Sequence, residues 1–407
     1  MALSLSQKSN MFSPSTRGLT LGAGGLIIIL LVFLSSRSPS YNPLDIATGR
    51  SRGYDHDRLL QDASNSTLGF QKIFVISLPS RTDHRDAMSL ASAFTGLDIE
   101  YVDGVTEVNK GALPPHDEKF KLSDKSYGSW RAHMNALRLI VEQNLTTALV
   151  LEDDVDWDLR IKSQMQDFGR ASQLLIQPGQ AGQEERDISE IPRTRSQTSP
   201  YGDIDRWDLL WLGHCGSHLP QPTDDDSNPT VPLDRVVFKD DQTVPETQHL
   251  RFEFGGDALK NEYGNHTRVY SHGRRNVCNF AYGLSQQGAR RFLHELAVVR
   301  LTSSTDLMFQ HMCDGFKRRK RHTCLSVQPP LFESHRKVAI DAGLNNAGEN
   351  GDESYDNEGF TPNIRWATMV NFPKLLAGET DYIDWSKDGE PRREHRAKQK
   401  AATSTGH

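Results

Sequence analysis

The stretch GSWRAHMNALRLIVEQNLTTALVLEDDVDWD, residues 128–158, places a helix pattern, a short apolar run and a group of acids in direct succession. Apolar residues recur at i, i+4, i+7 and i+11, which predicts an amphipathic helix: Trp130, Met134, Leu137 and Val141. The run from Ala148 to Leu151 then predicts a buried strand, and five acids lie between Glu152 and Asp158. Carboxylates this close repel one another unless water, basic partners or a cation relieves them.

The sequence before this stretch predicts a strand, a helix and a second strand. KIFVISL, Lys72–Leu78, is rich in β-branched and aromatic residues and ends at Pro79. A helix is expected to begin near Asp83 and to end at Gly96, and IEYV, Ile99–Val102, is the next strand. Two strands joined by one helix form a βαβ unit, and such units build parallel sheets.

The same alternation continues towards the C-terminus. Further strands are expected at WDLLWLG (207–213), NFAYGL (279–284) and TCLSVQ (323–328), with a helix that begins after Ser285. The sequence therefore predicts an α/β fold, a Rossmann-type domain with a mostly parallel central sheet, over residues 71–385. The charged residues 386–407 lack apolar anchors and are expected to be disordered.

The N-terminal part predicts entry into the secretory pathway. We expect a cytoplasmic tail at residues 1–18, a single transmembrane signal anchor at 19–36 and a flexible stem at 37–70, with a cleaved signal peptide as the alternative. Three N-x-Ser/Thr sequons, at Asn65, Asn144 and Asn265, agree with this placement. The expected location is the Golgi or ER membrane, as a single-pass type II protein with a luminal domain. A net charge of −6 argues against nucleic acid as a partner.

Four cysteines, Cys215, Cys278, Cys313 and Cys324, allow three full pairings in an oxidising compartment. Free buried thiols are the other reading, and the sequence does not decide between them.

The position of the acids predicts a metal site. Ligands of open parallel sheets bind outside the carboxyl ends of the strands. Glu152, Asp153 and Asp154 directly follow the expected strand, and alternation along an extended chain would send Glu152 and Asp154 to one side. Two carboxylates there suit Mn²⁺ or Mg²⁺ together with a substrate phosphate. The acid pair Asp203/Asp205 precedes its strand instead, and a merely solvated turn at Glu152 is the alternative reading.

Four segments together resemble glycosyltransferase family 25: KIFVISLPSRTDHRDAM, IEYVDGV, residues 128–158, and WDLLWLGHC. The resemblance covers roughly residues 71–335. It implies a GT-A-like fold and a metal-dependent inverting transfer of a hexose, most often galactose from UDP-galactose. The implied partners are the nucleotide-sugar donor and a glycan or glycoprotein acceptor.

The resemblance also assigns residues to the donor site. Glu152 and Asp154 correspond to the metal ligands, and Asp153 lies with them at the diphosphate. The residues implied to contact the nucleotide sugar are Ser77, Leu78, Arg81, Arg85, Asp103, Ser129 and His133. The family usually has Asn-Leu where this chain has Ser77-Leu78, which puts any contact from an asparagine side chain in doubt. Several of these residues have an alternative reading. Arg81 and Arg85 could be surface charges at the start of a helix. Asp103 could simply begin a turn, and His133 could be a histidine that packs in the core.

An inverting transfer needs a base for the acceptor hydroxyl. Asp306, in SSTDLMFQHM, matches the position of a later acidic element of the family and could equally be a helix-capping aspartate. Glu333 is the second candidate base, and His335 could complete the metal shell or lie exposed in a loop.

Two other functions remain to be weighed. Glycoside hydrolysis requires two carboxylates that are separated in space and no metal ion, and adjacent acids at one strand end do not meet this requirement. A non-catalytic luminal sugar-binding or adaptor protein on the same fold stays open.

Overall fold

The computed structural model describes residues 59–117, 119–177, 185–192, 198–221, 231–336 and 359–391. The expected cytoplasmic tail, membrane anchor, residues 37–58 of the stem and the tail from residue 392 lie outside these described residues. Within the described residues, no helix is both long enough and apolar enough to cross a membrane.

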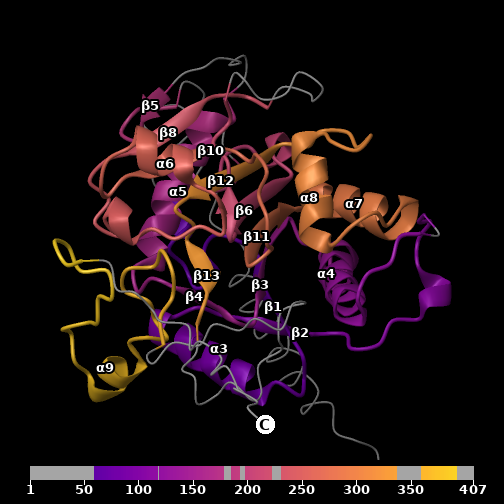
Figure 1. The fold of residues 1–407 in the computed structure, drawn as a ribbon, viewed down its shortest axis with the longest axis horizontal. Coiled ribbons are helices and arrows are strands. Elements are labelled where there is room, and N and C mark those ends of the chain that lie inside the picture. The colour runs from indigo at the N-terminus through magenta and orange to yellow at the C-terminus, as the bar shows by residue number, and fades with distance from the viewer. Residues whose placement is uncertain are drawn as a thin grey trace, which may run out of the picture. The chain divides into compact units, whose positions relative to one another are not determined.

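A mixed sheet forms the centre of the fold (Figure 1). Its strand order is β2 (Glu100–Asp103), β1 (Lys72–Ser77), β3 (Thr147–Glu152), β11 (Ala281–Ser285), β6 (Leu209–Gly213), β12 (Cys324–Gln328), β10 (Arg268–His272), β8 (Arg235–Phe238) and β5 (Glu185–Asp187). A further strand, β13 (Phe332–Ser334), pairs with both β6 and β4 (Val155–Trp157), while β7 (Gly216–Ser217) and β9 (Phe254–Gly255) form a separate pair. Among the described strands of the main sheet, β4, β10 and β11 run against the others, so the expected mostly parallel sheet is confirmed.

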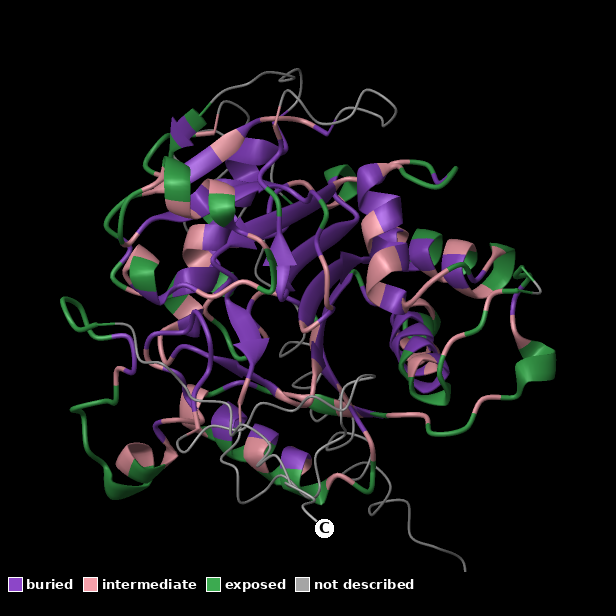
Figure 2. Cartoon of the chain, in the orientation of Figure 1, coloured by how far each residue is buried: buried purple, intermediate pink, exposed green. Residues whose placement is uncertain are grey.

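Helices cover the sheet on both faces. On one face, α3 (Thr82–Thr95) and α5 (Ile161–Leu175) pack on a core that includes Leu149 and Leu151 of β3. On the other, α4 (Asp124–Glu142), α7 (Gln286–His294) and α8 (Thr305–Asp314) lie together over Ala148 and Val150 (Figure 1). Because both faces are covered, the central strands are buried along their length, as Figure 2 shows.

Local sequence signals fix the helices beside β3. Ser123 caps α4 by accepting a hydrogen bond from the Ser126 amide, and Gly96 ends α3 in the left-handed conformation. At Gly128 a Cβ atom would lie 2.1 Å from the carbonyl oxygen of Val105. Only glycine therefore lets α4 approach the loop that follows β2.

Strand β10 was not expected, because its sequence, RVYSH, is polar. All five of its residues are buried. The fully buried guanidinium of Arg268 donates from Nε to Asp241 Oδ2 at 2.7 Å, and from Nη1 to the carbonyl oxygen of Pro329 at 2.8 Å. Charge pairing, which no apolar pattern reveals, makes this strand possible.

The domain is larger than its expected bounds of 71–385. Leu60, Ala63 and Phe70, assigned above to a flexible stem, are buried, and Ala63 and Phe70 belong to the hydrophobic core. At the other end, Ser386 is fully buried and Asp388 accepts from Arg365 Nη2 at 2.7 Å, so residues 386–391 are ordered rather than disordered. They follow α9 (Phe372–Ala377). The remaining short elements are α6 (Asp257–Glu262), η2 (Lys110–Ala112), η3 (Ile204–Arg206), η4 (Thr247–His249) and η5 (Glu295–Val299).

The four cysteines form two disulfides, Cys215–Cys278 and Cys313–Cys324. The free-thiol reading is therefore wrong. The first bond joins the chain after β6 to the chain before β11, at the sheet edge where β3 ends. This bond restrains the loops around the acids.

Candidate active site

The three consecutive acids at the end of β3 are held by three different elements. Glu152 Oε1 lies 3.2 Å from His133 Nε2 on α4, and Asp153 Oδ1 lies 2.9 Å from His84 Nδ1 on α3. Asp154 Oδ2 accepts from the Ser334 hydroxyl of β13 at 3.0 Å. The chain turns at Asp153 and Asp154 before β4, so the expected alternation stops at Glu152. The acids are oriented by the fold and are not a solvated turn.

His133 orients Glu152 through a buried relay. Its Nδ1 lies 2.8 Å from the hydroxyl of Tyr282 on β11, and both side chains are buried. Because a carboxylate only accepts hydrogen bonds, Nε2–H donates to Glu152 and Nδ1 of the neutral ring accepts from Tyr282. Burial raises the pKa of Tyr282 well above its usual value, which keeps the hydroxyl proton in place. His133 therefore contacts and orients Glu152, while its implied contact with the nucleotide sugar stays a prediction.

His84 performs the same task for Asp153, and the sequence did not identify it. Its Nδ1–H points at Asp153, and its Nε2 accepts from Arg81 Nη2. His84 is almost fully buried, although it lies between two arginines near the start of α3. The signal that the sequence offered was a histidine in the first turn of the helix that follows the first strand of the sheet.

The environment of Asp154 suits a cation. Burial, together with the negative charges of Glu152 and Asp153, raises the pKa of Asp154 to about 6. The protein therefore disfavours the negative charge of Asp154. The donor atoms of these three residues are all carboxylate oxygens, the ligands that Mg²⁺ and Mn²⁺ prefer. Glu152, Asp153 and Asp154 thus fit a divalent ion chemically.

The His335 side chain does not form a three-ligand cluster with the carboxylates of Glu152 and Asp154. Its amide donates to the Asp154 carbonyl oxygen at 2.8 Å, but its Nδ1 lies 3.0 Å from Thr361 Oγ1 and 3.8 Å from Asp156 Oδ2. Asp156 is fully buried, and burial raises its pKa to about 7. Among the described residues, three His or acid ligand atoms come within 4.8 Å of one another only at Glu246, His266 and Asp388. His335 therefore supports the turn at Asp154 in this arrangement.

The two arginines expected at the nucleotide lie at the same rim with acidic partners. Arg81 donates to both carboxylate oxygens of Asp83, at 2.9 and 2.8 Å. Arg85 donates from Nη2 to Asp103 Oδ1 at 2.6 Å and to the Ser77 carbonyl oxygen at 3.0 Å. Asp83 and Asp103 are exposed, so a phosphate could replace either one.

The other residues expected to contact the nucleotide sugar differ in their exposure to solvent. Ser77 is buried at the end of β1, and its hydroxyl lies 3.4 Å from Arg85 Nε. Leu78 is half-buried beside Gly104, and Ser129 is exposed on α4, one turn before His133. The structure thus brings Ser77, Arg85 and Asp103 into contact, whereas Ser129 makes no such contact in the described residues.

The two candidate bases, Asp306 and Glu333, differ in their exposure to solvent. Asp306, half-exposed in the first turn of α8, accepts from the Cys278 amide at 3.1 Å and from the Ser304 hydroxyl at 2.6 Å. Glu333 is buried, with its oxygens bound by the Ser334 amide and the Asn363 side chain at 3.1 Å each. Burial raises the pKa of Glu333 to about 8, so the protonated form is favoured at neutral pH.

Asn279 is a second residue that the sequence did not single out. It lies two residues before β11, and the carbonyl oxygen of its neighbour Phe280 accepts from the Glu152 amide at 3.0 Å. Both polar atoms of its buried side chain lack a hydrogen-bond partner among the described residues. Buried amides normally have partners, so the unpaired side-chain amide of Asn279 is unusual.

Comparison with known proteins bears on this same part of the chain. Residues 70–197, which contain the acids and the first strand and helix, match the family model described as glycosyltransferase family 25 (LPS biosynthesis protein). The match covers about a third of the 407 residues. The resemblance drawn from the sequence is therefore confirmed, and the family match supports a glycosyltransferase. Asp306, Glu333 and His335 lie beyond the matched residues.

Two relatives carry names from glycosyltransferase family 25. A Bos taurus protein named probable inactive glycosyltransferase 25 family member 3 is 26% identical over 161 residues, covering 36% of this chain and 22% of its own length. A Xenopus laevis protein named procollagen galactosyltransferase 1-B is 28% identical over 112 residues, covering 24% of this chain and 18% of its own length. The chain thus spans about a fifth of the length of these relatives.

Proposed function

We propose that the chain is a metal-dependent, inverting glycosyltransferase that moves a hexose, galactose from UDP-galactose, to a glycan or glycoprotein acceptor. The observation that carries the proposal is the set of three carboxylates at the end of β3, each oriented by a separate element. The family match over residues 70–197 includes all three. The choice of galactose is supported by the name of the Xenopus laevis relative, a procollagen galactosyltransferase.

The donor would lie along the carboxyl ends of β1, β2 and β3. Glu152 and Asp154 would hold Mn²⁺ or Mg²⁺, with Asp153 beside them. A bound divalent ion would supply positive charge to the departing diphosphate. Arg81 and Arg85 would exchange their exposed acid partners for phosphate oxygens, and His84 and His133 hold the carboxylates in place without touching the donor.

Asp306 is the base that we favour. During the transfer, the acceptor hydroxyl gives its proton to the base while its oxygen bonds to the anomeric carbon. The bond from that carbon to the diphosphate oxygen breaks, and the leaving group keeps the electron pair. Both carboxylates accept a hydrogen bond at each oxygen, but Asp306 is half-exposed in the first turn of α8, whereas Glu333 is buried. Glu333 would therefore stabilise the β4–β13 pair.

We also propose an ER or Golgi location with the domain in the lumen. The two disulfides are the support from the structure, because such bonds persist in oxidising compartments. The exposed sequon residue Asn65, in a turn on the described surface, is accessible to glycosylation.

A non-catalytic sugar-binding protein remains the second candidate, because the Bos taurus relative is named as probably inactive. One assay separates the two. The purified chain is supplied with Mn²⁺ and a panel of sugar nucleotides, and release of the nucleotide is measured with and without acceptor glycans. Turnover of one donor supports the transferase, and donor binding without turnover supports the second candidate.

Asp154→Asn tests the assigned metal site, and Asp205→Asn is the matched control in the other acid pair. Loss of a ligand worth several kcal/mol should lower turnover by about 100-fold or more. Asp205 is exposed and lies before β6, so its variant should keep normal turnover. Normal activity of Asp154→Asn would contradict the proposed metal role.

A further inference from the structure

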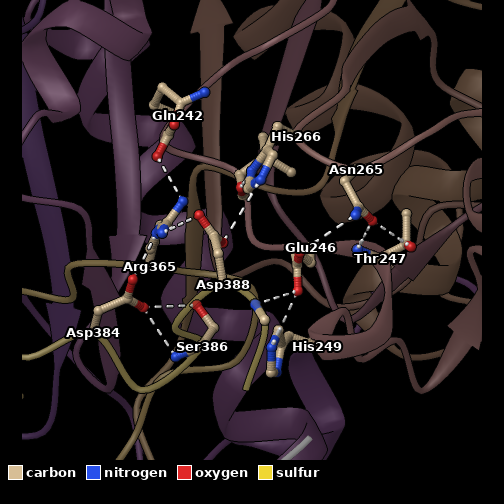
Figure 3. Close-up of polar contacts among 12 residues, drawn as sticks. Gln242, Glu246, Thr247, His249, Asn265, His266, Arg365, Asp384, Ser386 and Asp388 are labelled. Atoms are coloured by element: carbon tan, nitrogen blue, oxygen red, sulfur yellow. Dashed lines mark hydrogen bonds and ion pairs between the residues drawn. The ribbon is translucent and has the colours of Figure 1, made fainter. Parts of the chain in front are cut away.

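A second group of potential metal ligands lies outside the candidate active site. Glu246 precedes η4, His266 precedes β10, and Asp388 lies in the ordered segment after α9. One ligand atom from each lies within 4.8 Å of the others. Figure 3 shows their side chains turned towards one another from three separate parts of the chain.

The hydrogen bonding of His266 fixes its tautomer. Its Nδ1 lies 2.7 Å from the carbonyl oxygen of Val244, so this nitrogen carries the proton and donates it. In the neutral ring, Nε2 then presents a lone pair, and it faces Asp388 Oδ1 at 3.6 Å. Two acceptors facing each other repel unless a cation lies between them. A backbone carbonyl bound to the far nitrogen is the usual support of a metal-binding histidine.

His249 provides a second, independent observation. It is 1% exposed, and neither ring nitrogen has a hydrogen-bond partner among the described residues. Its Nε2 points at Glu246 Oε2 from 4.0 Å, which is too long for a hydrogen bond (Figure 3). A buried imidazole without partners is costly, and a shared metal ion would satisfy its Nε2.

The acids of the group are themselves oriented. Glu246 Oε2 accepts from the Gly389 amide at 3.1 Å and from Gln248 Nε2 at 2.7 Å. Asp388 Oδ2 is bound by Arg365 Nη2 at 2.7 Å, which leaves Oδ1 towards His266. These contacts fix the two carboxylates, which lie on the same side of the His266 imidazole in Figure 3.

We propose that Glu246, His266 and Asp388, with His249 as fourth ligand, bind one divalent transition-metal ion of the zinc class. Zinc binds imidazole nitrogen and carboxylate oxygen at about 2.0–2.2 Å, so two ligands of one ion lie at most about 4.2 Å apart. The separations of 3.6 Å (His266–Asp388) and 4.0 Å (His249–Glu246) meet this limit. The other separations among Glu246, His266 and Asp388 are at most 4.8 Å and need side-chain shifts of less than about 1 Å. His249 lies outside this 4.8 Å group, so its imidazole has to move towards the ion. The mixed nitrogen and oxygen set distinguishes this site from the oxygen-only acids of β3.

The ion would have a structural role. It would join the segment that carries Asp388 to the loops before η4 and β10, which are distant from it in sequence. Binding energy gained only in the folded state adds to its stability. This inference does not depend on the proposed transferase activity.

The test uses the purified full chain after treatment with a chelator. Zinc is titrated by calorimetry and by competition with a chromophoric indicator, and metal content is measured by mass spectrometry. Trypsin cleavage after Lys387, which is 68% exposed, reports on the same segment. We expect one tight zinc per chain, a higher Tm and slower cleavage at Lys387 with zinc.

Variants test whether zinc binds at Glu246, His266 and Asp388. His266→Ala and Asp388→Asn should each weaken zinc binding by 10-fold or more, whereas Asp154→Asn should retain it. His294→Ala is the control, because His294 is exposed and lies 3.8 Å from the acid Glu295. Asp388 is exposed, so its conservative variant keeps the test valid if His266→Ala fails to fold. Equal zinc affinity in wild type and Asp388→Asn, or no zinc binding at all, would mean that the group is an ion pair only.

Discussion

Replacement of Tyr282 by phenylalanine probes the relay that orients Glu152. The change removes a hydroxyl that lies 2.8 Å from His133 Nδ1 in a fully buried position, and it leaves the ring in place. His133 then has an unsatisfied buried acceptor, which costs about 1–3 kcal/mol of folding stability. It also loses the contact that fixes its ring against Glu152, and groups that support a metal ligand typically contribute 10- to 100-fold to affinity. We expect the Mn²⁺ affinity to fall by that factor, about 1.4–2.7 kcal/mol.

The assay is nucleotide release as a function of Mn²⁺ concentration, with chemical unfolding measured in parallel. Tyr270→Phe is the matched control, because Tyr270 is equally buried and its hydroxyl lacks a partner among the described residues. The control should keep its metal dependence and lose no stability. If Tyr282→Phe gives the same Mn²⁺ dependence as Tyr270→Phe, the relay does not act on Glu152 and the reasoning is refuted.

Three further predictions concern the fold around the site. Arg268→Leu should lower the free energy of unfolding by about 3–5 kcal/mol, because it leaves the buried Asp241 charge unpaired, and urea denaturation measures it. Burial lowers the pKa of His272 to about 4, below its usual 6.5, so the unfolded chain binds an extra proton there. As pH drops from 6.5 to 4, His272 alone should remove at most about 3 kcal/mol of stability. Cys215→Ser with Cys278→Ser should cost about 2–4 kcal/mol and reduce turnover, which melting and nucleotide release measure.

Each of the three has a result that contradicts it. An Arg268→Leu variant as stable as wild type would contradict the first prediction. If the double variant Arg268→Leu/Asp241→Leu is as stable as wild type, the loss in the single variant comes from the unpaired charge of Asp241. The pH dependence is assigned to the wrong residue if His272→Gln keeps the full slope between pH 6.5 and 4. The disulfide has no effect on the site if the double serine variant is destabilised but turns over normally.

The sequence predicted the elements near the acids well. Around β3, both the helix period and the apolar strand were strong, because a sheet covered on both faces needs continuous apolar strands. The position of the acids at the rim followed from strand direction alone. The orientation of Glu152 by His133 was also within reach, since the resemblance placed that histidine at the site.

The site contacts that the sequence did not predict join residues far apart in the chain. His84 and Asp153 are separated by 69 positions, and Ser334 and Asp154 by 180. No local pattern links such pairs. Strand β10 was missed because Arg268 and His272 are read as surface residues unless Asp241 and the covering helix are known. Helix α5 was missed because several of its buried positions are glutamines and serines, Gln164, Ser172 and Gln173 among them.

The ordered chain beyond residue 385 has a practical consequence for fragment design. An expression fragment ending at Trp385 would delete the fully buried Ser386, and with it the carboxylate of Asp388 that neutralises Arg365. Such a truncated product would expose the indole of Trp385 and leave a guanidinium short of one counter-charge. Poor yield or loss of activity from that fragment would reflect a misplaced cut rather than an inactive enzyme.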